Sequence, residues 1–227
     1  NLSSTNIALT IWPVFHEYAA KEFEFSVCGS CGCNLSCSQV CNEGFIHFSE
    51  FSMNINNLNN ENNCFNNDDI DVLQDLISIN GLDYFSPLDI GIQTWNMGRL
   101  ISLHVNYVQY GANGMNRQLI NLPDNIGQLT QLTSLYIENH NLSNLPNSVT
   151  QLTNLQTLTI LNNKLTSIPD NLGNLISLFY LDLSYNQLYS MPESIGELVN
   201  LEYLYLFNNQ LNSLPETICN LNLNWDA

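Results

Sequence analysis

The sequence predicts an α/β solenoid in which short parallel strands stack into one sheet on the concave side. The first observation is a period of 23 residues: the segment that begins at Leu132 recurs at Leu155, Leu178 and Leu201. The second is that each copy has apolar residues at its first, fourth and sixth positions, the last two spaced as in a strand with one buried face. Successive copies of this kind are the signature of stacked units, each of which buries its apolar side against its neighbours.

With the residues that follow the strand, the copies follow the pattern L-x-x-L-x-L-x-x-N-x-L, as in the stretch from Leu178 to Leu188, with Ile at some of the Leu positions and His140 at the Asn position of the first copy. On this pattern the chain resembles the leucine-rich repeat family over roughly residues 97–227. The resemblance implies a solenoid with a parallel sheet on its concave face. The physical argument agrees, because a strand of about five residues cannot bury its apolar side alone.

The asparagine of the pattern has a physical reason. The chain turns after each strand, where backbone groups are hidden from water, and a short amide offers both donors and an acceptor to them. The resemblance implies that Asn163, Asn186 and Asn209 form the asparagine ladder of the family. His140 stands at the same position of the first copy, which predicts a looser or specially bonded turn there.

The two ends of the repeat array differ from its middle. Leu100 begins a degenerate copy, but Leu132 follows it by 32 residues, so we expect an insertion around residues 110–116 to bulge from this turn. At the other end a further copy begins at Leu214, and the sequence ends at Ala227. We therefore expect residues 100–227 to be open at the C-terminal end: a truncation, a capping segment outside the sequence, or an assembly surface.

Residues 64–99 are predicted to cap the solenoid. Acidic residues at 68–71 precede an amphipathic pattern, which predicts a helix at about 69–80 that covers the edge of the first strand. Calcium binding by these acids is the alternative, although their spacing is not that of an EF-hand loop. The Trp95 segment leads into Gly98-Arg99-Leu100 and resembles N-terminal caps of secreted bacterial repeat proteins.

Residues 1–63 are predicted to be a cysteine-rich, β-containing region of unknown fold. Apolar alternation around Ile7, Phe23 and Phe51 indicates short strands. An even number of closely spaced cysteines favours disulfides and an oxidising compartment, with zinc binding or thiol redox chemistry as alternatives. The disulfide candidates are Cys28, Cys31, Cys33, Cys37, Cys41 and Cys64.

The composition excludes several function classes. The 227 residues include 4 Lys and Arg against 21 Asp and Glu, a formal net charge of −17. So few cations exclude nucleic acid as a partner, and the absence of a run of about 18 apolar residues excludes membrane insertion. We predict no enzyme activity, cofactor or metal, because the four histidines are dispersed and neither paired carboxylates nor a nucleophile motif is found. Because neither Met nor a leader segment begins the sequence, we interpret it as part of an exported, extracellular protein.

Residues that alternate with the buried ones are predicted to face outward on the concave sheet. Aromatic and acidic side chains gather there, and aromatic rings give contact area at low cost in side-chain entropy. Cross-strand packing of exposed rings is the alternative interpretation. The candidate ligand-binding residues are Tyr136, Glu138, Tyr180, Asp182, Tyr185, Tyr203, Tyr205 and Phe207.

The sequence thus predicts a non-enzymatic extracellular binding or adhesion module that recognises a protein or a carbohydrate through this face. The alternative is a structural subunit of a self-assembling extracellular filament or surface layer, joined through the open C-terminal edge.

Overall fold

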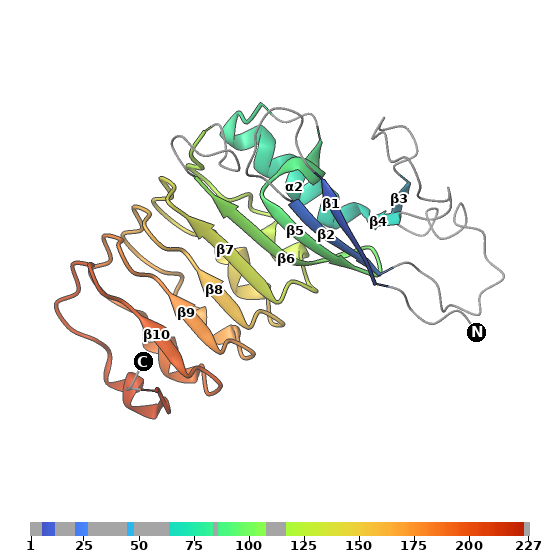
Figure 1. Cartoon of the computed structure of the whole chain (residues 1–227). Coiled ribbons are helices and arrows are strands. Elements are labelled where there is room, and N and C mark those ends of the chain that lie inside the picture. The colour runs from blue at the N-terminus through green and yellow to red at the C-terminus, as the bar shows by residue number, and fades with distance from the viewer. Residues whose placement is uncertain are drawn as a thin grey trace, which may run out of the picture.

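The computed structural model describes residues 6–11, 21–26, 45–47, 64–83, 86–107 and 117–224, with side chains from Phe65 onward. These residues form a curved solenoid with one main sheet, and short 3₁₀ helices lie on the side opposite the sheet in each turn (Figure 1). No helix of this part of the chain is both long and apolar enough to cross a membrane.

The main sheet has eight strands. In sheet order they are β1 (Asn6–Ile11), β2 (Lys21–Ser26), β5 (Ile92–Asn96), β6 (Arg99–Asn106), β7 (Ser134–Glu138), β8 (Thr157–Thr159), β9 (Tyr180–Asp182) and β10 (Tyr203–Tyr205). The strands β3 (Phe45–His47) and β4 (Cys64–Asn66) form a separate antiparallel pair. The helices are α2 (Asn67–Asn80), η1 (Pro87–Asp89), η2 (Ile126–Gln128), η3 (Asn147–Gln151), η4 (Leu172–Asn174), η5 (Glu193–Glu197) and η6 (Glu216–Asn220).

The parallel register of β7 to β10 confirms the predicted solenoid. Leu135, Leu158, Leu181 and Leu204 lie directly beside one another in the sheet. The first three are fully buried, and Leu204 packs half-buried against the same core. The 23-residue period therefore places equivalent leucines one strand apart, so that each turn covers the apolar side of the one before it.

The 3₁₀ turns pack closely because of the Ile-Gly-x-Leu segments. A β-carbon at Gly173 would lie 2.7 Å from the carbonyl oxygen of Ser194 in the next turn, closer than any side chain tolerates. Proline precedes η3, η5 and η6 with an extended backbone, which suits the entry to a short helix. Proline thus begins three of these helices, and glycine at positions 127, 173 and 196 makes room for the next turn in η2, η4 and η5.

The helix α2 closes the N-terminal end of the core. Asn66 caps it by accepting a hydrogen bond from the backbone N–H of Asp69, and Gly81 ends it in the left-handed conformation at φ 58°. The side chain of Asn80 is buried and bonds the backbone of Ile120 and Asn121, which attaches the helix to the first turn of the solenoid. We expected α2 to cover the edge of the first strand of the solenoid, β6. That edge is instead paired with β5 in an antiparallel hairpin, and α2 packs on η1, β4 and η2.

A buried ion pair fixes the same junction. Asp69 is fully buried, and its two oxygens accept hydrogen bonds of 2.9 Å from the guanidinium of Arg99. One of these oxygens also accepts the backbone N–H of Leu100 at 2.8 Å. This carboxylate therefore orients the start of β6. Because both of its oxygens already accept hydrogen bonds from Arg99 and Leu100, a structural role accounts for Asp69 in the acidic run.

Two strands lie where the N-terminal alternation predicts them. β1 and β2 pair antiparallel, and β2 continues the main sheet beside β5, with Phe25 opposite Trp95. The expected strand near Phe51 and the expected insertion at residues 110–116 lie outside the described residues. The same holds for the side chain of Cys64 and for the other five disulfide candidates, Cys28, Cys31, Cys33, Cys37 and Cys41.

Candidate functional site

The concave face is formed by the side chains that alternate with the buried leucines. Because the strands are in register, these outward side chains form rows that run across the sheet. One row contains Ser102, Ser134, Thr157, Tyr180 and Tyr203. The neighbouring row contains His104, Tyr136, Thr159, Asp182 and Tyr205. The first row thus begins with small polar residues, the second begins with His104 and Tyr136, and both end with tyrosines.

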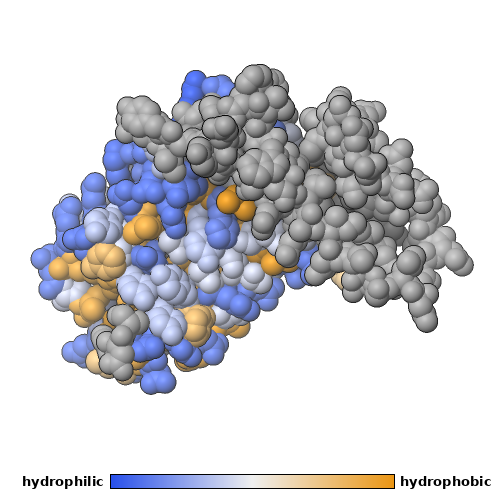
Figure 2. Space-filling model, in the orientation of Figure 1, coloured by the Kyte–Doolittle hydropathy of each residue, from blue (hydrophilic) through white to orange (hydrophobic). Residues whose placement is uncertain are grey.

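Six aromatic rings at β9 and β10 form a continuous cluster, which we call the aromatic patch. The rings of Tyr180 and Tyr205 have centroids 5.4 Å apart, and each ring contacts at least one other edge-on or tilted. The members are Phe179, Tyr180, Tyr185, Tyr203, Tyr205 and Phe207. Pale residues of intermediate hydropathy gather over this end of the sheet, with orange apolar residues among them (Figure 2).

The aromatic patch is open to solvent at both margins. Phe179 is 41% exposed at one margin, and Tyr185 and Phe207 are 49% and 51% exposed at the other. Ring-to-ring packing therefore orders the cluster without burying it, which confirms the cross-strand packing of these rings and leaves part of their surface open. Away from the patch, Tyr136 stacks on His104 at a centroid distance of 3.9 Å.

The acidic residues of the face lie deeper than alternation alone predicts. Asp182 is only 9% exposed, with Thr159 beside it on β8 and Tyr205 beside it on β10, and it offers little surface of its own. Glu138 is half-buried and accepts a hydrogen bond of 3.3 Å from Asn106. Burial raises the pKa of Glu138, and the negative charge of Asp182 raises it further. The two carboxylates therefore share one region of negative potential.

In each of the four turns that follow β7 to β10, the residue directly before the ladder position has a left-handed backbone conformation. The φ angles are 63° at Asn139, 52° at Asn162, 55° at Tyr185 and 54° at Asn208. Asparagine tolerates this conformation, whereas a bulky aromatic residue seldom adopts it. Asn162 donates to Asn139 and Asn139 to Asn106, each at 2.8 Å, so the amides form an exposed row that Tyr185 interrupts.

The conformation of Tyr185 was missed in the sequence analysis, although a signal exists. The position before the ladder residue is Asn in three of the four copies and Tyr only at Tyr185. A position where three copies carry a residue suited to positive φ predicts positive φ in the fourth. The tyrosine is therefore held in a costly conformation, and its ring contacts Phe207 at 5.3 Å.

The three expected ladder residues make equivalent hydrogen bonds. In each, the Oδ1 atom accepts the backbone N–H of the residue 21 positions earlier, at 3.0–3.1 Å. Each Nδ2 atom donates to the carbonyl 26 positions earlier, at 2.7–2.9 Å. The ladder residues are Asn163, Asn186 and Asn209. These bonds tie three turns to the preceding ones, through buried groups at Asn163 and Asn186 and through partly buried groups at Asn209.

His140 makes one of the two hydrogen bonds that each ladder asparagine makes. Its Nδ1 atom accepts the backbone N–H of Leu119, also 21 positions earlier, at 3.0 Å. The Nε2 atom makes no hydrogen bond of acceptable geometry with the described residues, although the carbonyl of Val105 is near enough to favour the protonated ring slightly. Burial outweighs this effect and lowers the pKa of His140 to about 4. The ring is therefore neutral at physiological pH.

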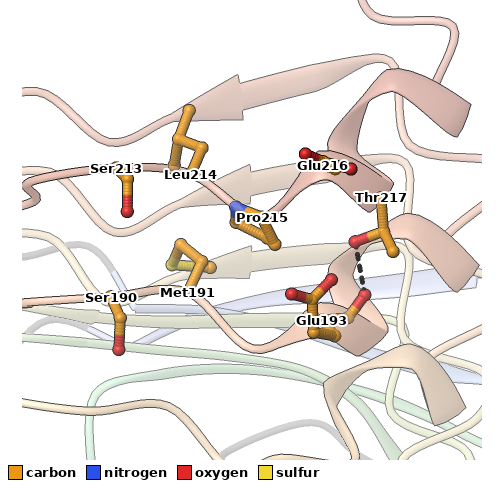
Figure 3. Close-up of a pocket in the computed structure, with 8 residues that line it drawn as sticks. All are labelled: Ser190, Met191, Glu193, Ser213, Leu214, Pro215, Glu216 and Thr217. Carbon is orange, nitrogen blue, oxygen red and sulfur yellow. Dashed lines mark hydrogen bonds between the residues drawn. The ribbon is translucent and has the colours of Figure 1, made fainter.

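A hollow of about 540 Å³ lies on another side of the last two turns, between the segments that lead into η5 and η6 (Figure 3). Its lining includes Met191 and Leu214, and the hydroxyl of Thr217 donates to the backbone carbonyl of Glu193 at 2.6 Å. The described residues contain no group of three His, Cys, Asp or Glu that could hold a metal ion. Cys219 is exposed and forms no disulfide within this part of the chain.

Comparisons with known proteins agree with this geometry. Residues 130–188 and 153–211 match a family model described as leucine rich repeat. Among curated proteins, none matches the chain. The leucine-rich repeat ectodomain of the receptor kinase SOBIR1 from Arabidopsis thaliana is similar in structure, with 26% identity and a TM-score of 0.55 over 70% of this chain and 91% of that one.

Two further solved structures are similar over a smaller share of their length. A plant ice-binding protein is 23% identical with a TM-score of 0.51, over 65% of this chain and 50% of that one, a likeness of fold alone. The BIR3–SERK2 complex from Arabidopsis thaliana gives 30% identity and a TM-score of 0.46, over 53% of this chain and 63% of that one. Residues 130–211, whose leucines lie in register at a 23-residue spacing and which match the family model, are leucine-rich repeats.

Proposed function

We propose that this chain is an extracellular protein-binding module and that its concave face, centred on the aromatic patch, contacts the partner. The observation that carries the proposal is the cluster of six mutually packed rings, partly open to solvent, on a rigid sheet. Aromatic residues held in place by their neighbours lose little entropy on binding and are the usual energetic centres of protein interfaces. The similarity to the ectodomain of a receptor kinase supports an extracellular setting.

The backbone strain at Tyr185 supports the same proposed function. A tyrosine in the left-handed region is strained by about 1–2 kcal/mol, and asparagine at this position would avoid the strain. Strain that the fold does not require is typical of functional positions. The ring instead extends the aromatic patch toward Phe207.

The proposal is tested by screening the chain against an array of extracellular proteins and an array of glycans. We expect saturable binding to at least one protein, lost in the double variant Tyr203→Ala, Tyr205→Ala. Tyr189→Ala is the matched control, because this tyrosine is 54% exposed but lies between β9 and η5, outside the sheet. Equal binding by the double variant and the control would show that the binding site lies elsewhere on the molecule.

Two outcomes would favour the other functions considered for this chain. Binding to glycans alone would support a carbohydrate ligand, for which the same aromatic rings are suited. An apparent mass that grows with concentration in light scattering would support self-assembly through the outer edge of β10, which pairs with no other described strand. Binding to a protein by a monomer of constant mass supports the proposed function.

A further inference from the structure

Beneath the aromatic patch lie polar atoms that lack partners. The Oδ1 atom of Asp182 accepts the backbone N–H of Ser184 at 2.9 Å, but its Oδ2 atom accepts no hydrogen bond from the described residues. Thr159 stands directly beside Asp182 in the sheet, is 4% exposed, and its hydroxyl makes no hydrogen bond. The hydroxyl of Ser184 is buried without a partner as well.

The buried, unpaired hydroxyls of Thr159 and Ser184 call for an explanation. A buried polar group without a hydrogen bond costs about 1–3 kcal/mol, and native proteins contain few of them. Thr159 and Asp182 both point out of the sheet on its concave side, because they alternate with the buried Leu158 and Leu181. Both residues therefore face a group that enters from this side, although the covered Oγ1 atom of Thr159 is reached only when the side chains above it turn aside.

The walls of this position are aromatic. Tyr136 and Tyr205 flank Thr159 and Asp182 in the same row, and the ring of Tyr180 lies 5.4 Å from that of Tyr205. Burial raises the pKa of Tyr180, and among the nearby charges Asp182 raises it most. The carboxylate therefore lies close to the rings as well as to the hydroxyls.

The strands around this carboxylate, β7 to β10, contain no Lys or Arg. Arg99 is bonded to Asp69, and burial lowers the pKa of His104, which favours its neutral form. Glu138 adds a second negative charge to the same region. An acidic, aromatic and partly desolvated position of this kind is complementary to a cation.

We propose that Asp182, Thr159 and the surrounding tyrosines hold an arginine side chain of the protein partner. The inference rests on the proposed function of the concave face. A guanidinium is planar and presents several N–H donors, so one can reach Asp182 Oδ2 and another Thr159 Oγ1 while the plane stacks on a tyrosine ring. Arginine fits better than lysine because its charge is more weakly hydrated and costs less to transfer into a buried position.

The test uses three acetylated and amidated tripeptides, Gly-Arg-Gly, Gly-Lys-Gly and Gly-citrulline-Gly, titrated at low salt and followed through the tyrosine NMR signals. Citrulline has nearly the shape of arginine without its charge. We expect the arginine peptide to bind at least about tenfold more tightly than the citrulline peptide. Asp182→Asn should abolish this preference and leave the fold intact, because its side-chain oxygen can still accept the N–H of Ser184.

Two further variants separate binding from folding. Glu197→Gln removes the same charge from the exposed end of η5 and should leave the preference unchanged. Thr159→Val removes the unpaired hydroxyl, so it should weaken binding of the arginine peptide without lowering the melting temperature. Equal affinity for arginine and citrulline peptides would overturn the inference, and equal affinity for arginine and lysine would overturn the choice of guanidinium. The proposed function would fail separately, if Tyr203→Ala, Tyr205→Ala left protein binding unaltered.

Discussion

The repeats of β7 and β8 and those of β9 and β10 share one scaffold but present different surfaces. On the inner side, Leu135, Leu158, Leu181 and Leu204 are the same residue at the same register. On the outer side, the position of Thr157 in β8 is occupied by tyrosine in both β9 and β10. Alternate residues of one strand are thus constrained differently: the inner ones are fixed by stacking, and the outer ones can differ from turn to turn.

The largest effect we expect comes from the one irregular inner position, His140. Its pKa is about 4 in the folded protein, against about 6.5 in an unfolded chain. The unfolded chain therefore takes up the proton first as the pH falls. The stability contributed by the neutral ring is present above about pH 6.5 and is lost toward pH 4, in total roughly 3 kcal/mol.

Urea unfolding between pH 7.5 and pH 4 measures this loss. His140→Asn restores the residue of the later turns and should flatten the pH dependence by about the same amount, since all other titrating groups are common to both proteins. Identical pH profiles of the two proteins would show that the buried ring does not titrate as its environment predicts.

The second largest effect is expected on the inner side of the later repeats, where the ladder asparagines bond the backbone. Asn186→Ala leaves the N–H of Leu165 and the carbonyl of Ile160 without partners, so we expect a loss of about 1–3 kcal/mol in the free energy of unfolding. Asn174→Ala, at the exposed end of η4, is the control and should change stability by less than about 0.5 kcal/mol. A denaturation midpoint unchanged in Asn186→Ala would refute the ladder.

The smallest effect on stability is expected on the outer side. Tyr185→Asn relieves backbone strain of about 1 kcal/mol but removes the contact with Phe207, worth about 0.5–1.5 kcal/mol, so the free energy of unfolding should change by less than about 1 kcal/mol. Partner binding should nevertheless weaken clearly. The reciprocal change, Asn162→Tyr, should cost stability and add no binding. A large loss of stability in Tyr185→Asn would mean that the ring serves the fold.

The sequence predicts the solenoid well because its cause is periodic. Equivalent leucines 23 residues apart can be buried in only one way, and the position of the aromatic rows follows from strand alternation. The depth of Asp182 could not be predicted, because it depends on how far the side chains of adjacent turns lean over it. The ion pair of Asp69 with Arg99 was missed for a similar reason, since it depends on how the cap is placed on the first turn.

Uniform spacing between β7 and β10 has a practical consequence. Because each turn touches only its immediate neighbours, the two turns that carry the tyrosines form a cassette whose upper and lower boundaries are ordinary leucine layers. Such a cassette could be inserted into another solenoid of equal period, or duplicated within this one, and would carry the proposed binding surface with it. Recombination between copies would then create new specificities without redesigning an interior.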